Sequence, residues 1–221
     1  MKRLFALLLC GALMVPPGLA APAADWPQWA EEALSWGRET SISRDLLAVP
    51  GKTVTRGMAA QLLYEAAGRP AVPGKCPFTD VSGDNADAVT WAAERGYLTG
   101  VGDGKYEPDR SVTRQEFAAI LWRRAGSPGA AVQGLDQFRD AGAVGEWART
   151  PVLWALQAGV MAGQSGGRLA PTGTITAAEA LVMLERAHTL PDVAQLRADL
   201  EALTAAHRPI GPRGRRTPSS T

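Results

Sequence analysis

The sequence predicts an all-α chain of three repeats, each made of a helix, a glycine-rich loop and a second helix. Internal similarity is the first observation, because Phe78-Thr79-Asp80-Val81 returns as Phe138-Arg139-Asp140-Ala141, 60 residues later. The second is helical spacing of apolar residues, seen at Phe117, Ile120 and Leu121. The third is that no segment alternates apolar and polar residues long enough to predict a strand. Together they favour a helical repeat protein.

Composition and charge exclude several classes of protein. The chain has 221 residues, of which 46% are hydrophobic and 20% charged, and this excludes a disordered or collagen-like protein. Six of its 23 basic residues lie near the two ends, and the other 17 face 22 acidic residues. The six are Lys2, Arg3, Arg208, Arg213, Arg215 and Arg216. A folded body with an acidic excess lacks the basic surface of a nucleic-acid binder, so no nucleic-acid partner is expected.

Residues 1–23 have the order of a secretory signal peptide: basic residues, an apolar run from Leu4 to Val15, then small residues. The apolar run is too short to span a bilayer as a helix. Cleavage is expected after Ala20 or Ala23, which predicts a secreted protein without a membrane contact after cleavage. Only Cys76 then remains, so the mature chain forms no internal disulfide.

The first repeat, residues 25–69, is the most divergent. Trp36 and Val54-Thr55-Arg56 correspond to residues of the later repeats, but the glycine-rich loop is missing. The second repeat spans residues 77–126 and the third residues 138–190, with linkers of proline and glycine between repeats. After them we expect an amphipathic helix over residues 191–207 and a basic, disordered tail over residues 208–221.

The start of each second helix carries a capping signature. Thr113 and Glu116 precede an apolar run by the spacing of a capping box, and Thr176 and Glu179 repeat this pattern. We interpret these four residues as structural, helix-capping residues. In the first repeat Met58 replaces the glutamate, so the box is incomplete there.

The arginine that follows the capping threonine predicts a binding role. A cation at the first helical position opposes the helix dipole, so Arg114 needs another reason to be there. Backbone amides and a guanidinium at one helix start converge on a carboxylate, and this makes Arg114 and, in the first repeat, Arg56 candidate ligand-binding residues. The alternative is an ordinary surface salt bridge. The third repeat has Ala177 at this position, so its own signature segment is expected to be structural, although it can lend residues to a neighbouring groove.

Tryptophan recurs at one position of each first helix. Trp36, Trp91 and Trp154 have small alanine neighbours, which is typical of packing anchors, and the alternative is a groove wall on which a sugar stacks. The second interpretation adds Trp91 and Trp154 to the candidate ligand-binding residues. The other four tryptophans receive no ligand role.

Catalytic residues are few. The only histidines, His188 and His207, allow neither a catalytic triad nor a zinc cluster with ordinary spacing, and the loop from Gly100 to Lys105 lacks the Ser or Thr of a phosphate-binding loop. The segment from Asp103 onward also departs from a calcium loop, because Pro108 stands where the turn needs glycine. We therefore expect no enzyme activity, no cofactor and no metal.

The motifs of the middle repeat resemble an S-layer homology module. They are Phe78-Thr79-Asp80-Val81, Trp91-Ala92, Gly96 to Gly100, Gly102 to Pro108 and Val112 to Phe117. The resemblance covers roughly residues 25–190 and implies three helical repeats around a pseudo-threefold axis. It also implies binding of pyruvylated secondary cell-wall polysaccharide, and hence a noncatalytic protein on the cell wall or cell surface of a bacterium with a Gram-positive type envelope.

Two functions are thus open. The first is a module that anchors to cell-wall polysaccharide, with the pyruvate carboxylate bound at Arg114. The alternative is a structural or interaction protein with degenerate glycan grooves, which recruits a protein partner through its C-terminal helix or tail.

Overall fold

The computed structural model describes residues 25–190. The expected signal peptide, C-terminal amphipathic helix and basic tail lie outside the described residues. Within that range the protein is helical and has no strand, so the all-α prediction is confirmed. The α-helices are α1 (Glu31–Glu39), α2 (Arg44–Leu47), α3 (Arg56–Ala66), α4 (Asn85–Glu94), α5 (Arg114–Arg124), α6 (Arg149–Gln157) and α7 (Ala177–Thr189). Three 3₁₀ turns, η1 (Gln28–Ala30), η2 (Ala141–Ala143) and η3 (Glu146–Ala148), complete the described elements.

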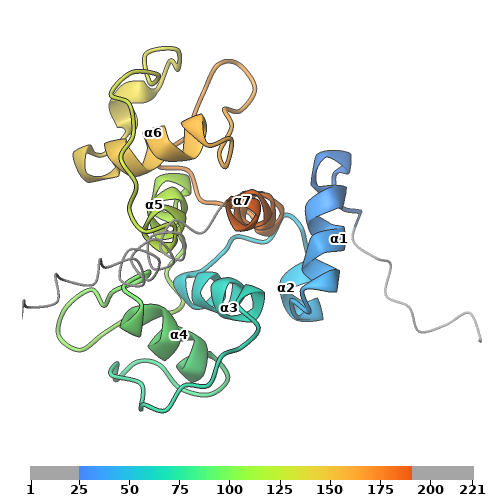
Figure 1. Cartoon of the computed structure of the whole chain (residues 1–221), viewed down its shortest axis with the longest axis vertical. Coiled ribbons are helices and arrows are strands. Elements are labelled where there is room, and N and C mark those ends of the chain that lie inside the picture. Colours follow the sequence, from blue (N-terminus) through green and yellow to red (C-terminus); the bar gives the residue numbers. More distant parts are fainter. Residues whose placement is uncertain (1–24, 191–221) are drawn as a thin grey trace, which may run out of the picture.

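The helices form a ring of three pairs. The second helices of the repeats, α3, α5 and α7, lie at the centre, and α1, α4 and α6 lie around them (Figure 1). Each central helix packs against the first helix of another repeat: α3 against α4, α5 against α6, and α7 against α1. The last contact joins the third repeat to the first, so the ring closes on itself.

A cycle of three backbone hydrogen bonds joins the segments that lead into the central helices. Val112 donates its amide to the carbonyl of Val54, Val54 donates to Ile175, and Ile175 donates to Val112, each at 2.9 Å. All three side chains are buried. The cycle pairs otherwise unsatisfied backbone groups of the core and sets the three helix starts around one axis.

The first-turn amides of the central helices find acceptors in neighbouring repeats. In α5, Arg114 donates its amide to Gly173 at 2.9 Å and Gln115 donates to Pro171 at 3.0 Å, while the Thr113 hydroxyl accepts from Glu116. The same arrangement holds at α3 and α7, where Gly57 donates to the carbonyl of Pro108 and Ala178 donates to Pro50. Orphan amides of a helix start are thus satisfied by protein.

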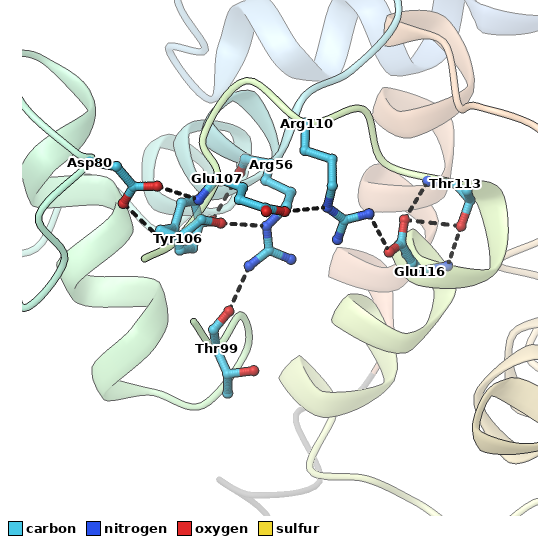
Figure 2. Close-up of polar contacts among 8 residues, drawn as sticks. All are labelled: Arg56, Asp80, Thr99, Tyr106, Glu107, Arg110, Thr113 and Glu116. Atoms are coloured by element: carbon cyan, nitrogen blue, oxygen red, sulfur yellow. Dashed lines mark hydrogen bonds and ion pairs between the residues drawn. The ribbon is translucent and has the colours of Figure 1, made fainter. Parts of the chain in front are cut away.

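The recurring Phe-x-Asp motif fastens the loop between the two helices of repeats two and three. Both carboxylate oxygens of Asp80 accept backbone amides, from Tyr106 and Glu107, each at 2.8 Å (Figure 2). Asp140 does the same for its own loop, at residues 169 and 170. The ring of Phe78 packs so closely on Gly100 that a Cβ there would lie 2.6 Å from it. These contacts hold the loop carbonyls in place for the site described next.

Candidate functional site

Two equivalent grooves lie between the repeats, and each is lined by residues from all three. The larger has a volume of about 500 Å³ and is lined by Arg114, the Ala162–Ser165 loop, Glu179, Arg186 and Trp29, with apolar residues of α7. The smaller has a volume of about 120 Å³ and is lined by Arg56, Thr99, Glu116, Arg123 and Trp147, with apolar residues of α5. Repeat-equivalent residues therefore take equivalent places in the two grooves.

Arg114 crosses from the second repeat to the third at the floor of the larger groove. Its Nε donates to the carbonyl of Leu169 at 3.1 Å, and its Nη2 donates to the carbonyl of Ala162 at 2.9 Å. Its Nη1 pairs with Glu179 at 2.9 Å. The residue is only 4% exposed. Arg114 therefore ties the glycine-rich loop of one repeat to the helix start of another.

Arg56 makes the equivalent crossing from the first repeat to the second (Figure 2). Its Nε donates to the carbonyl of Tyr106 at 2.8 Å and its Nη2 to the carbonyl of Thr99 at 2.6 Å. The guanidinium also lies over the Tyr106 ring, 4.6 Å from its centroid. Glu116, which would match Glu179, instead pairs with Arg110 at 2.9 Å.

Burial lowers the pKa of the Arg114 guanidinium, and the neighbouring carboxylate of Glu179 partly offsets this. Burial likewise lowers the pKa of Arg56, with Tyr106 acting in the opposite direction. Burial by itself would raise the pKa of Glu116, but the Thr113 amide and the Arg110 guanidinium outweigh it and lower that pKa. The smaller groove therefore keeps an ionised carboxylate at Glu116.

These contacts correct two sequence-based expectations. Arg114 and Arg56 do not sit at the helix start against the dipole without compensation, because carbonyl acceptors from the next repeat surround them. The helix amides that were expected to bind a carboxylate together with the guanidinium already have protein acceptors, at Gly173 and Pro171 for α5. An anion can be reached only by the remaining N–H groups of the guanidinium, not by the backbone.

The capping residues occupy the expected positions. In α5 the Thr113 hydroxyl accepts from the Glu116 amide, and the Glu116 carboxylate accepts from the Thr113 amide at 2.8 Å. Thr176 and Glu179 form the same capping box in α7. Glu179 does more than cap, because its Oε1 also receives Arg114 and the side-chain amide of Gln164.

Trp91 and Trp154 are buried, at 5% and 7% exposure. Neither lines the two grooves, although Trp91 borders a separate cavity of about 370 Å³ near the ends of the central helices. Trp91 packs against Tyr64 in a tilted arrangement and against Tyr97 edge to face, with ring centroids 5.7 and 5.4 Å away. Of the two interpretations open for these residues, the packing anchor fits this position better than the sugar-stacking wall.

The exposed tryptophans of the grooves are Trp29 and Trp147, which received no ligand role from the sequence. They are 59% and 56% exposed and hold equivalent positions beside the larger and the smaller groove. The signal that could have found them is the shared Trp-Ala pair, since Trp29-Ala30 and Trp147-Ala148 each have a buried alanine beside an exposed indole. The third repeat also lends its loop and Glu179 to the groove of Arg114, as the sequence allowed.

Residues 25–190 contain no group of three or more His, Cys, Asp and Glu side chains suited to hold a metal ion. In the same range, no helix has the length and apolar character needed to cross a membrane. His188 lies 3.2 Å from Arg124 and beside the Trp36 ring, and burial lowers its pKa, with Arg124 adding to the shift.

Comparison with known proteins identifies the repeats. The model of the S-layer homology domain matches residues 77–118 and 137–181. The expected first repeat, residues 25–69, lies outside these two segments.

Three similar proteins each align with about 60% of this chain. The Surface-layer 125 kDa protein of Lysinibacillus sphaericus is 32% identical over 142 residues, which cover 62% of this chain and 12% of that protein. Exoglucanase XynX of Acetivibrio thermocellus is 30% identical over 141 residues, 61% of this chain and 13% of the enzyme. The Cellulosome-anchoring protein of Acetivibrio thermocellus is 27% identical over 146 residues, 62% of this chain and 32% of that protein.

The shared region thus covers between 12% and 32% of the length of these relatives. Both matched segments contain the Phe-x-Asp motif, the glycine-rich loop and the capping box whose geometry is described above. Residues 77–118 and 137–181 are therefore two S-layer homology domain repeats within this chain.

Proposed function

We propose that this protein is a noncatalytic cell-surface module that binds secondary cell-wall polysaccharide, with a pyruvylated sugar in the larger groove. The observation that carries the proposal is the composition of that groove, where Arg114 and Arg186 accompany an exposed Trp29 and a polar loop. A flat indole offers a stacking surface for a sugar ring, and guanidinium groups suit the carboxylate of a pyruvate ketal. The similarity to the Cellulosome-anchoring protein of Acetivibrio thermocellus supports an anchoring role.

Within this proposal Arg114 and Arg56 border their grooves and keep part of their hydrogen-bonding capacity. A guanidinium has five N–H donors, and the contacts of Arg114 to Leu169, Ala162 and Glu179 use three of them. The smaller groove, at about 120 Å³, has less room for a sugar than the larger one, at about 500 Å³. We therefore expect the groove of Arg114 to supply most of the affinity.

Co-sedimentation with cell-wall sacculi tests the proposal. The mature protein is expected to pellet with sacculi that carry their secondary polymer and to remain in solution after the polymer is removed chemically. Trp29→Ala, at an exposed position, should reduce the bound fraction without changing the free energy of unfolding, and Val132→Ala, an exposed residue outside both grooves, is the matched control. Equal pelleting with intact and stripped sacculi would overturn glycan binding and leave the protein-interaction alternative.

A further inference from the structure

The two grooves share a second arginine whose role neither the capping signature nor the family motif indicates. Arg186 lines the larger groove and Arg123 the smaller, and each lies ten residues after the capping threonine of its helix. Each makes one long hydrogen bond to a loop carbonyl, Arg186 to Gly159 at 3.4 Å and Arg123 to Tyr97 at 3.3 Å. Among the salt bridges of the described residues, neither arginine has a carboxylate partner.

Three charged residues line the larger groove: Arg114, Glu179 and Arg186. Arg114 and Glu179 form an ion pair in which the arginine side chain is only 5% exposed. The charge of Arg114 is therefore compensated inside the protein, and most of its donors are occupied. Arg186 is the remaining charged residue of this lining, and it is exposed. The net positive charge of the larger groove consequently comes from Arg186.

We propose that Arg186 is the residue that binds the acidic substituent of the glycan in the larger groove, that Arg123 is its equivalent in the smaller groove, and that Arg114 and Arg56 chiefly act as positioning residues. This inference rests on the proposed function and names the selectivity determinant of that same site. An exposed guanidinium on the end of a flexible side chain can present a bidentate fork to a carboxylate. The buried arginines hold the loop against which the sugar lies.

The third junction of the ring supplies an internal comparison. At the position of Arg186 and Arg123, the first repeat has Glu65, which is 1% exposed. Its carboxylate accepts from the Ser43 amide at 2.8 Å and from the side chains of Gln61 and Arg69. The position that is cationic in two junctions, exposed at Arg186 and half-buried at Arg123, is thus anionic and buried in the third, so we expect two binding grooves of unequal strength.

Titration of purified variants with a pyruvylated disaccharide, and with the same disaccharide lacking pyruvate, tests the inference. Wild type should prefer the pyruvylated sugar, and Arg186→Gln should lose about tenfold to a hundredfold in affinity for it, as expected for one charge-assisted contact. Affinity for the unmodified sugar should stay the same. Arg186→Lys should keep a reduced preference, because it retains the charge without the planar fork. Arg123→Gln should weaken only the lower-affinity binding phase, which belongs to the smaller groove.

Arg38→Gln is the matched control, because Arg38 is an exposed helical arginine that lines neither groove. Melting curves should show wild-type stability for Arg38→Gln and both Arg186 variants. If Arg186→Gln keeps the wild-type preference for pyruvylated sugar, the inference is wrong while the proposed function stands. If wild type binds neither sugar, the proposed function is wrong and the inference falls with it.

Discussion

The junctions between repeats are of two kinds. Where the first repeat meets the second, and the second meets the third, a buried arginine from a central helix donates to two carbonyls of the next loop. Where the third repeat meets the first, Ala177 has no such donor, and the short helix α2 (Arg44–Leu47) replaces the glycine-rich loop. The missing arginine and the missing glycine-rich loop therefore belong to the same junction.

This difference explains why the arginine and the loop disappear together. The arginine of one repeat is satisfied only by carbonyls of the next repeat, so a missing loop would leave a buried guanidinium without acceptors. The junction of the third repeat with the first, which we call the closing junction, uses Glu65 instead. The Glu65 carboxylate accepts from the amide of Ser43 and so anchors the segment before α2. In the sequence, the arginine is missing from the third repeat and the glycine-rich loop from the first. The closed ring brings these two positions together at one junction.

The largest expected effect on stability is at the two junctions that contain a buried arginine. Arg114→Ala should lower the free energy of unfolding by about 2–4 kcal/mol, because two carbonyls and Glu179 lose a buried donor. Arg56→Ala should cost about 1–3 kcal/mol, since it removes two hydrogen bonds and no ion pair. Urea denaturation measures both. Equal stability of Arg114→Ala and wild type would show that the junction does not depend on the arginine.

Glu65 should stabilise the closing junction. Glu65→Ala is expected to lower the free energy of unfolding by about 2–3 kcal/mol, because the Ser43 amide loses its acceptor and a cavity opens where the buried Glu65 side chain was. Denaturation of the variant, compared with Glu94→Ala at an exposed end of α4, measures the cost. A change as small as that of Glu94→Ala would mean that Glu65 does not replace the missing arginine contact.

Installing the missing arginine tests the same comparison from the other side. Ala177 is 4% exposed and has no glycine-rich loop opposite it, so Ala177→Arg should destabilise the fold by about 1–3 kcal/mol through overpacking. Ser35→Arg, on an exposed part of α1, controls for the added charge. A stabilised Ala177→Arg protein would show that the first repeat can still accept the guanidinium.

The smallest effects are expected at the helix caps, which are local and do not depend on the junction. Thr113→Ala and Thr176→Ala should each cost about 0.5–2 kcal/mol of unfolding free energy, because each removes the acceptor for an N3 amide. Thr55→Ala should cost less than either, since Met58 gives it no capping box. Thermal denaturation of the three variants ranks them, and the reverse ranking would contradict the role of the glutamate.

Much of the fold was predictable from the sequence by itself. Helical periodicity, the repeat of Phe-x-Asp and glycine motifs, and the Thr-x-x-Glu capping boxes predicted an all-α chain and the starts of α5 and α7. These features depend on residues three or four positions apart, and such local interactions can be read along the chain. The same motifs identified the family.

The tertiary structure decided the character of the site. The partners of Arg114 lie 48, 55 and 65 residues away, so no spacing rule near Arg114 indicates that its guanidinium is buried. Trp29 and Arg186 border one groove although they come from opposite ends of the described chain. Only ring closure, which packs α7 against α1, places them together. Long-range packing, not local propensity, therefore determines which arginine is buried and which meets solvent.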